Sequence, residues 1–137
     1  ALPAIKYTVG GKERQDSVQN GLAEISSEFV AVHDGARPLV TKAEVDKVIA
    51  DARKFGAALL AVPTKATIKQ AAADGDEPLV AATPNRKTLW EAHTPQVIRA
   101  DLLRQGFENA TSKSLAVTDD VSLVEALGEP VKLTEGE

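Results

Sequence analysis

The sequence of 137 residues contains no cysteine and few aromatic residues. Without cysteine, the chain can form no disulfide, no zinc–thiolate centre and no thiol nucleophile. Phe, Trp and Tyr together make up 4% of the residues, so the core must be built from Ala, Val, Leu and Ile. Such aliphatic residues are typical of α/β proteins, in which strands buried on both faces form continuous apolar runs.

An excess of positive charge and long apolar runs are also missing. The net charge is −4, from 16 Lys and Arg against 20 Asp and Glu. A nucleic-acid polymer requires a basic surface that displaces counterions, so the charge balance counts against such a partner. No apolar run approaches the roughly 20 residues that span a membrane, which counts against a membrane partner. The chain begins at Ala1 without a methionine or a signal-peptide pattern, which we interpret as a fragment or a processed chain.

Apolar spacing predicts strands that alternate with helices. We expect strands at residues 5–9, 29–32, 57–62 and 131–133, and helices at residues 17–25, 41–56, 101–110 and 118–128. The strand, helix and strand between residues 29 and 62 form a βαβ unit, which joins parallel strands. Thr41 and Glu44 have the spacing of a capping box, and Thr118 is expected to cap the last helix. The chain is therefore interpreted as one α/β domain.

Residues 64–88 differ from this pattern. Short alternating pieces at 66–69 and 78–81 flank Asp74-Gly75-Asp76, which is a turn signal. We interpret the segment as a β-hairpin arm that projects from the sheet. Because a two-stranded arm is marginally stable alone, we expect it to pack on a second subunit.

Two loops that follow predicted strands carry the polar residues of interest. In the loop at residues 10–17, paired glycines precede a helix start, an arrangement that suits an anion but is also common in ordinary turns. In the loop at residues 33–38, Asp34 and Arg37 could hold a metal-bound phosphate or a polyol. The alternative for Asp34 and Arg37 is an ion pair that only braces the loop.

Six segments appear together in the order and spacing of one enzyme family. They are Gly-Gly-Lys-Glu-Arg-Gln-Asp-Ser-Val (10–18), Val-His-Asp-Gly-Ala-Arg-Pro (32–38), Val-Pro-Thr-Lys-Ala-Thr-Ile-Lys (62–69), Asn-Arg-Lys-Thr-Leu-Trp (85–90), His-Thr-Pro-Gln (93–96) and Val-Thr-Asp-Asp-Val-Ser (117–122). Over essentially its whole length, the chain resembles the 2-C-methyl-D-erythritol 4-phosphate cytidylyltransferases, with a closer likeness to the plant and algal branch.

The resemblance implies a Rossmann-like nucleotidyltransferase sheet with a projecting β-arm, through which the family forms homodimers. It implies transfer of CMP from CTP to methylerythritol phosphate with release of pyrophosphate, aided by Mg²⁺, in non-mevalonate isoprenoid synthesis. The expected location is the plastid stroma for a plant or alga and the cytoplasm for a bacterium.

The resemblance also implies roles for individual residues. Contacts with the nucleotide are implied for Gly11, Lys12, Ser17 and Gly35. Contacts with the second substrate are implied for Asp34, Arg37, Thr67, Arg86, Thr94 and Thr118. Asp34 is also a candidate metal ligand, and Thr67 and Arg86 on the arm would reach across the dimer. Ser17 and Thr118 could instead be helix caps, and Thr67 a strand residue.

The sequence departs from the family at both ends. It lacks the opening Gly-rich loop of Ala-Ala-Gly-x-Gly type with its lysine, and the closing Asn-Ile-Lys segment. Residues 1–137 are therefore interpreted as an incomplete domain without the principal catalytic lysines. Three alternatives stay open: a ribitol phosphate cytidylyltransferase, a non-catalytic dimerising fragment, and a metal hydrolase that uses His33 and Asp34. The last is least favoured because two histidines and no cysteine leave few metal ligands.

Overall fold

The computed structural model describes residues 4–73 and 75–137, within which four strands form one sheet in the order β1-β5-β2-β6. The strands are β1 (Phe29–Val32), β2 (Ala57–Pro63), β5 (Trp90–Arg99) and β6 (Lys132–Glu135). β5 runs antiparallel to both β1 and β2, whereas β2 and β6 are parallel. The predicted α/β class is confirmed, and β1 and β2 of the βαβ unit run in the same direction. They are not neighbours, however, because β5 lies between them.

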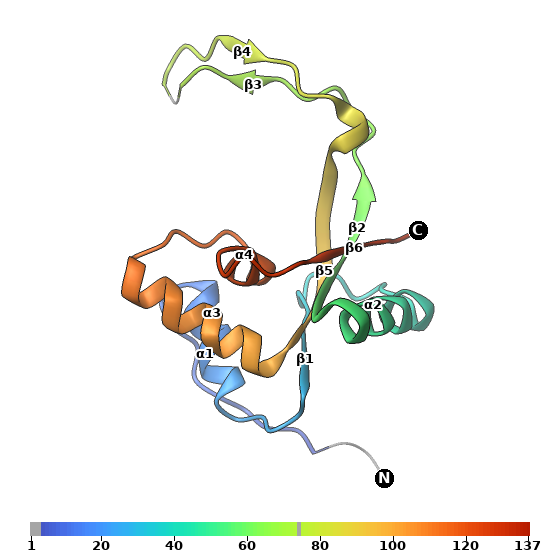
Figure 1. The fold of residues 1–137 in the computed structure, drawn as a ribbon, viewed down its shortest axis with the longest axis vertical. Helices are drawn as coiled ribbons and strands as arrows, with labels where there is room; N and C mark the ends of the chain where they lie inside the picture. Colours follow the sequence, from blue (N-terminus) through green and yellow to red (C-terminus); the bar gives the residue numbers. More distant parts are fainter. Residues whose placement is uncertain (1–3, 74) are drawn as a thin grey trace.

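Helices cover both faces of this sheet (Figure 1). They are α1 (Arg14–Leu22), α2 (Lys42–Phe55), α3 (Ala100–Lys113) and α4 (Asp120–Glu125). α2 lies on one face, and α1, α3 and α4 lie on the other. None of the described helices is long and apolar enough to cross a membrane.

The alternation of side chains along β2 explains the two apolar layers. Ala57, Leu59 and Ala61 belong to the buried cluster that includes residues of α3 and α4. Ala58 and Leu60 point the other way and pack in the cluster that includes residues of α2. A strand buried on both faces needs small or aliphatic residues throughout, so the prediction of a core poor in aromatic residues is confirmed.

Both ends of α2 follow the predicted signals. The Thr41 hydroxyl accepts a hydrogen bond from the Glu44 backbone N–H (3.2 Å), and the Glu44 carboxylate accepts one from the Thr41 N–H (3.0 Å). Gly56 ends the helix with φ = 94°, a left-handed conformation that suits glycine. These contacts are local, which is why the sequence predicts this helix well.

Glu44 also connects α2 to the chain beyond β6, and this predicts a pH effect. Backbone N–H groups of Thr41 and Glu137 donate to the carboxylate and hold the pKa of Glu44 below its usual value of 4.5. A lowered pKa stabilises the fold above the unfolded value, and that stabilisation is lost as the pH falls through the folded value. We therefore expect Glu44→Gln to lower the unfolding temperature at neutral pH, with the difference disappearing below pH 4.5. Thermal unfolding of both proteins between pH 7 and pH 2 checks this, and a constant difference would contradict it.

Three local predictions are wrong. Residues 5–9 pair with no described strand, and the side chains of Ile5, Tyr7 and Val9 are at least 75% exposed. A strand needs a neighbour for its backbone hydrogen bonds, and this segment instead lies along α1, where the Asn20 side chain donates to the Val9 carbonyl (3.1 Å). Two capping predictions also fail: the N-cap of α1 is Glu13, with Ser17 inside the helix, and the N-cap of α4 is Asp119. In α4, the Asp119 carboxylate accepts from the Ser122 N–H, so Thr118 lies one residue too early.

The arm projects from the body of the protein as an antiparallel hairpin (Figure 1). Its strands are β3 (Gln70–Ala71) and β4 (Val80–Ala82), and η1 (Arg86–Thr88) leads back to β5. The hairpin prediction is confirmed, although the strands are shorter than expected and begin a few residues later. The predicted turn includes residue 74, which lies outside the described residues.

Close contact between α3 and α4 predicts a large packing effect at Gly106. A Cβ added at Gly106 would lie 2.8 Å from Leu123 Cβ and 3.2 Å from its backbone. We therefore expect Gly106→Ala to lower the free energy of unfolding by about 1–3 kcal/mol, because α4 must move. Chemical denaturation measures the change. Gly21→Ala is the matched control, since no atom lies within 4 Å of an added Cβ in α1 and alanine favours helix. Equal effects at the two positions would contradict the prediction.

Candidate functional site

The loop before α1 folds back onto the first turn of the helix. The Gly11 N–H donates to the Ser17 hydroxyl (2.9 Å), which donates in turn to the Glu13 carbonyl (3.4 Å). A Cβ at Gly11 would overlap the Cβ of Asp16 and lie 3.0 Å from its carbonyl carbon. Gly11 and Ser17 are thus held together, with the exposed Lys12 between them.

The loop after β1 is tied to the central strand by Thr94. The buried Thr94 hydroxyl accepts a hydrogen bond from the Asp34 N–H (3.0 Å) and lies 3.0 Å from His33 Nδ1. His33 Nε2 lies 2.8 Å from the Arg37 carbonyl oxygen. Because one ring nitrogen of His33 lies against Thr94 on β5 and the other against the Arg37 carbonyl of the loop, the histidine acts as a brace. This argues against the hydrolase alternative, in which His33 would be a metal ligand.

Asp34 and Arg37 form the ion pair that the sequence allowed. Arg37 Nε donates to Asp34 Oδ2 at 3.3 Å, and 36% of the Asp34 side chain is exposed. The carboxylate therefore braces its loop and still faces solvent. Within residues 4–73 and 75–137, no three His, Cys, Asp or Glu side chains gather as a metal site. Asp34 fits a weaker role, as one hard oxygen ligand for a cation that is held mostly by phosphates.

Arg14 links this loop to α4, a contact that the sequence did not predict. Its Nη1 donates to both carboxylate oxygens of Asp120 (3.0 and 2.9 Å), and its Nη2 donates to Asp34 Oδ1 (3.2 Å). The Asp120 side chain is 1% exposed, whereas that of Arg14 is 46% exposed. One guanidinium therefore joins three segments of the chain.

The pKa values of the two carboxyl groups bound by Arg14 are shifted in opposite directions. Burial raises the pKa of Asp120, and the hydrogen bonds and charge of Arg14 offset only part of that rise. At Asp34, partial burial also acts to raise the pKa, but hydrogen bonds from Arg14 and Arg37 outweigh it and leave the pKa below its usual value. Asp34 is therefore ionised at neutral pH, whereas the buried Asp120 has a raised pKa although the same guanidinium binds it.

Gln96 on β5 holds the start of α4. Its buried side chain accepts a hydrogen bond from the Val121 N–H (3.1 Å) and donates to the Asp119 carboxylate (3.3 Å). The exposed Thr118 lies beside this turn, with its hydroxyl 3.2 Å from the Ser122 hydroxyl. The sequence alone identifies Asp119 and Asp120 only as acids at a helix start. No sequence signal pairs Asp120 with Arg14, which lies 106 residues earlier.

Most of the predicted site residues meet in this region. The loops and strand that meet there carry Gly11, Lys12, Ser17, Asp34, Gly35, Arg37, Thr94 and Thr118. Thr67 and Arg86 do not, because both are exposed on the arm. Arg86 Nη1 donates to the Lys65 carbonyl (2.7 Å) at the base of the arm.

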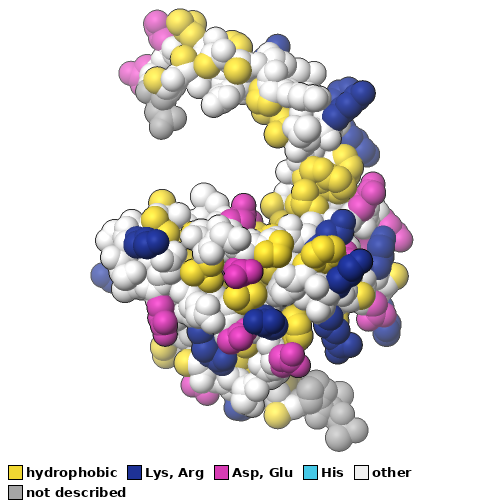
Figure 2. Space-filling model, in the orientation of Figure 1, with side chains coloured by type: hydrophobic (Ala, Val, Ile, Leu, Met, Phe, Trp, Pro, Cys, Tyr) yellow, Lys and Arg dark blue, Asp and Glu magenta, His cyan; other side chains and the backbone are white. Residues whose placement is uncertain are grey.

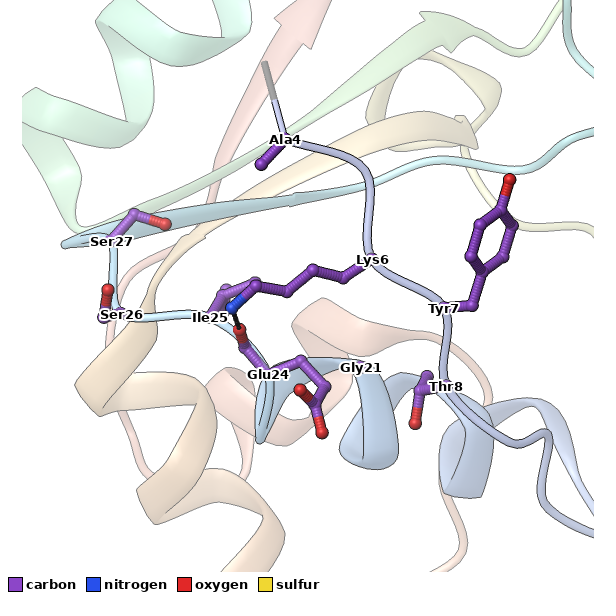
Figure 3. Close-up of a pocket in the computed structure, with 9 residues that line it drawn as sticks. All are labelled: Ala4, Lys6, Tyr7, Thr8, Gly21, Glu24, Ile25, Ser26 and Ser27. Atoms are coloured by element: carbon purple, nitrogen blue, oxygen red, sulfur yellow. Dashed lines mark hydrogen bonds between the residues drawn. The ribbon is translucent and has the colours of Figure 1, made fainter.

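A separate hollow of about 480 Å³ lies between residues 4–8 and the end of α1 (Figure 3). Lys6 reaches across it, and its Nζ donates to the Glu24 carbonyl at 3.0 Å. None of the predicted site residues lines this hollow. The candidate site is therefore the polar region around Asp34, and this hollow carries no part of it.

Comparison with known proteins identifies similar sequences over the whole chain. The model of the IspD family, described as 2-C-methyl-D-erythritol 4-phosphate cytidylyltransferase, matches residues 1–137. A protein of that name from Oryza sativa subsp. japonica, described as chloroplastic, is 57% identical over 134 residues, covering 96% of this chain and 44% of the rice protein. The enzyme of Desulforamulus reducens is 49% identical over 129 residues, covering 93% of this chain and 54% of its own length. The chain thus spans about half the length of these curated relatives.

Solved structures agree with the sequence comparison. The 4-diphosphocytidyl-2C-methyl-D-erythritol synthase of Anaerococcus prevotii superposes with a TM-score of 0.89 at 33% identity, covering all of this chain and 63% of that protein. The 2-C-methyl-D-erythritol 4-phosphate cytidylyltransferase of Thermus thermophilus has a TM-score of 0.81 at 38% identity, covering 93% of this chain and 61% of that protein. The fold and the sequence therefore point to the same family.

Proposed function

Because the chain belongs to the 2-C-methyl-D-erythritol 4-phosphate cytidylyltransferase family, we propose that it transfers CMP from CTP to 2-C-methyl-D-erythritol 4-phosphate. Pyrophosphate is the second product, and the reaction belongs to non-mevalonate isoprenoid synthesis. The proposal rests on the hydrogen bonds that join the segments at residues 10–14, 33–38 and 118–121 to one another and to Thr94. Apart from Ser17 in α1 and from Thr67 and Arg86 on the arm, the residues that the family resemblance singles out are Thr94 and residues of these segments, which lie far apart in the chain.

The reaction requires alignment of the two substrates and neutralisation of negative charge on their phosphates. The attacking group is a phosphate oxygen that is already ionised, so no strong general base is required. The protein must hold the two substrates in line and stabilise negative charge in the transition state. Hydrogen-bond donors on rigid, connected loops suit both tasks.

The nucleotide side of the proposed site is the pair of glycine-containing loops. Gly11 and Lys12 contact the cytosine base, and Ser17 supports the loop through its hydrogen bond with the Gly11 N–H. A Cβ added at Gly35 would meet no atom within 4 Å, so the backbone there is open to a ligand. Close approach of backbone donors is the physical reason for glycine at such positions.

The methylerythritol phosphate side consists of Asp34, Arg37, Thr94 and Thr118. Arg37 can bind a phosphate with two parallel N–H donors, and Asp34 can accept from a substrate hydroxyl. Thr94 supports the position of Asp34, since its buried hydroxyl accepts from the Asp34 backbone.

The metal in this proposal is Mg²⁺, with Asp34 as its protein ligand. Magnesium prefers oxygen ligands and is usually held by one or two carboxylates together with substrate phosphates. When bound, it neutralises charge on the phosphates of CTP. The exposed, ionised carboxylate of Asp34 supports this assignment.

The arm is proposed to form a homodimer, in which Thr67 and Arg86 reach the substrate phosphate of the partner subunit. Apolar side chains gather along the arm (Figure 2), where Ile68, Leu79 and Val80 are 40%, 75% and 63% exposed. An exposed apolar hairpin is costly in water, and a second copy of the arm would cover it. Thr67 and Arg86 lie apart from the other site residues in one subunit, which favours action across the interface.

Removal of the arm tests the dimer. We expect replacement of residues 64–88 by a short glycine-serine linker to convert the dimer into a monomer, because the apolar contact between arms is lost. Analytical ultracentrifugation measures the change at equal protein concentrations. A dimer that persists without the arm would contradict this prediction.

The plastid stroma is the location that we favour. The 57% identity with a rice protein described as chloroplastic supports it. Cytoplasm is the alternative, because the other relatives include bacterial enzymes.

Calorimetric titration with CTP and Mg²⁺ is the first test of this function. This chain is compared with a version extended by the N- and C-terminal segments that the longer relatives carry. We expect the extended protein to bind CTP and to release pyrophosphate when methylerythritol phosphate is added. Competition with ribitol phosphate distinguishes the related polyol phosphate enzyme. Absence of CTP binding by both versions would overturn the proposal and favour a dimerising module.

A further inference from the structure

One arginine connects three segments of the candidate site. Arg14 begins α1, directly after the loop that contains Gly11, and its guanidinium makes three hydrogen bonds of 2.9–3.2 Å to Asp34 and Asp120. Asp34 lies 20 residues from Arg14 along the chain, and Asp120 lies 106 residues away. The contacts therefore come from the tertiary fold.

We infer that Arg14 is a positioning residue, which orients the Asp34 carboxylate by anchoring it to the buried carboxylate of Asp120. The inference rests on the proposed function for its catalytic consequence. Its structural part concerns this chain alone.

The two carboxylates bound by Arg14 differ in burial, and the buried one is the anchor. Asp120 is 1% exposed and lies in the first turn of α4, which Gln96 holds through the Val121 N–H. Both oxygens of its carboxylate accept from one nitrogen of Arg14, Nη1. The second terminal nitrogen, Nη2, donates to Asp34, whose side chain is 36% exposed, so the guanidinium is held at two of its nitrogens by two different carboxylates. The buried Asp120 therefore fixes the position of the Arg14 guanidinium, and Arg14 in turn fixes the position of the half-exposed Asp34 carboxylate.

The buried charge of Asp120 is a second reason for the contact with Arg14. Asp120 is a buried carboxylate, and a buried charge needs a partner that also satisfies its hydrogen bonds. Arg14 provides that partner, and Arg37 is the second cation at Asp34. Loss of Arg14 therefore leaves Asp120 without its ion-pair partner. Asp34 is then held only by Arg37 of its own loop and, through its backbone N–H, by Thr94 of β5.

Arginine is required for geometric reasons. A guanidinium carries five N–H donors in a rigid plane, so it can bind two carboxylates in fixed directions at once. A lysine ammonium is a point charge on a flexible stem and can approach either carboxylate without fixing its plane. Arg14→Lys should therefore preserve the positive charge beside Asp34 and Asp120 but no longer orient the Asp34 carboxylate.

Hydrogen exchange on the 137-residue chain tests the structural part. We expect Arg14→Gln to accelerate amide exchange by at least about 10-fold both at residues 33–38 and at residues 118–122, with residues 57–62 of β2 unchanged. The matched control is Arg99→Gln, which also removes an arginine bound to an aspartate, Asp101 (3.0 and 3.3 Å). Arg99 pairs with Phe29 at the start of β1, far along the strand from Asp34. Unchanged exchange at residues 33–38 would overturn the inference.

Kinetics of the extended protein test the catalytic part. We expect Arg14→Gln to lower kcat about 10- to 100-fold, because a small misplacement of a catalytic group has effects of this size, with each KM changed less than about 3-fold. Arg14→Lys should recover the unfolding temperature and not kcat. The double variant Arg14→Gln, Asp120→Asn removes the unpaired buried charge and should likewise recover only the unfolding temperature. Recovery of kcat in either variant, or an equal loss in Arg99→Gln, would show that Arg14 only stabilises the fold. If the unsubstituted extended protein transfers no CMP, the proposed function fails, and the exchange experiment still decides whether Arg14 orients Asp34.

Discussion

Substitution of Gly11 by alanine is expected to weaken nucleotide binding strongly in the extended protein. A Cβ at this position would overlap Asp16 Cβ and approach the Asp16 carbonyl carbon to 3.0 Å, so residues 10–16 would have to move apart. The Gly11 N–H would then lose the Ser17 hydroxyl, which holds the loop against α1. We expect the affinity for CTP to fall by at least about 100-fold, equivalent to about 2.7 kcal/mol.

The neighbouring glycine provides a matched control for this experiment. A Cβ added at Gly10 would meet only the Ser17 hydroxyl oxygen, at an ordinary contact distance of 3.6 Å. Gly10→Ala should therefore bind CTP within about 3-fold of the unsubstituted protein, a change of about 0.65 kcal/mol. Calorimetry with Mg²⁺ and CTP measures both affinities, and circular dichroism checks that both variants are folded. A similar affinity for the two variants would show that the loop at residues 10–17 does not bind the nucleotide.

Removal of the Arg86 side chain is expected to affect one substrate and not the other. Arg86 is exposed on the arm, away from the loops that are proposed to bind CTP. If it binds the substrate phosphate in the partner subunit, Arg86→Ala removes a charge-assisted contact worth about 2–3 kcal/mol. We expect KM for methylerythritol phosphate to rise about 30- to 100-fold, with CTP affinity nearly unchanged. Steady-state kinetics with each substrate varied in turn, together with CTP calorimetry, measure this.

Two controls separate substrate binding from the structure of the arm. Lys87→Ala removes a neighbouring exposed cation from the same short helix, η1, and should have little effect. Arg86 also donates to the Lys65 carbonyl, so sedimentation must show that the Arg86→Ala protein is still a dimer. Mixed dimers of Arg86→Ala and Asp34→Asn subunits should regain activity, because one of their two sites contains both native residues. Equal losses for CTP and methylerythritol phosphate, or no recovery in mixed dimers, would refute action across the dimer.

The length and start of α2 could be predicted because their causes are local. The capping box joins Thr41 and Glu44, three residues apart, and Gly56 allows the positive φ that ends the helix. The aliphatic run of β2 likewise predicts a strand buried on both faces. Family motifs also predicted residues that lie far apart in the chain and whose loops the structure brings together, such as Asp34, Thr94 and Thr118.

Other parts of the fold depend on partners that are distant in sequence. No strand is among the predictions for residues 90–99, where the structure has β5. Pro95 lies inside this strand, and proline is unusual within a central strand. In the structure, Gln96 beside it pairs with both Val32 and Leu59, and Pro95 lies where the register with β2 shifts. Conversely, residues 5–9 were predicted as a strand and pair with no described strand, since a strand exists only with a neighbour.

The sequence by itself determined the α/β class, both ends of α2, the arm and the family of this protein. Apolar spacing and helix capping depend on residues that are close together in the sequence. The order of the motifs is visible directly along the chain. Only the tertiary structure decided that β5 separates β1 from β2 and that Arg14 joins Asp34 to Asp120. The physical reason is that a hydrogen bond between residues 106 positions apart exists only after the chain has folded, and no local pattern records it.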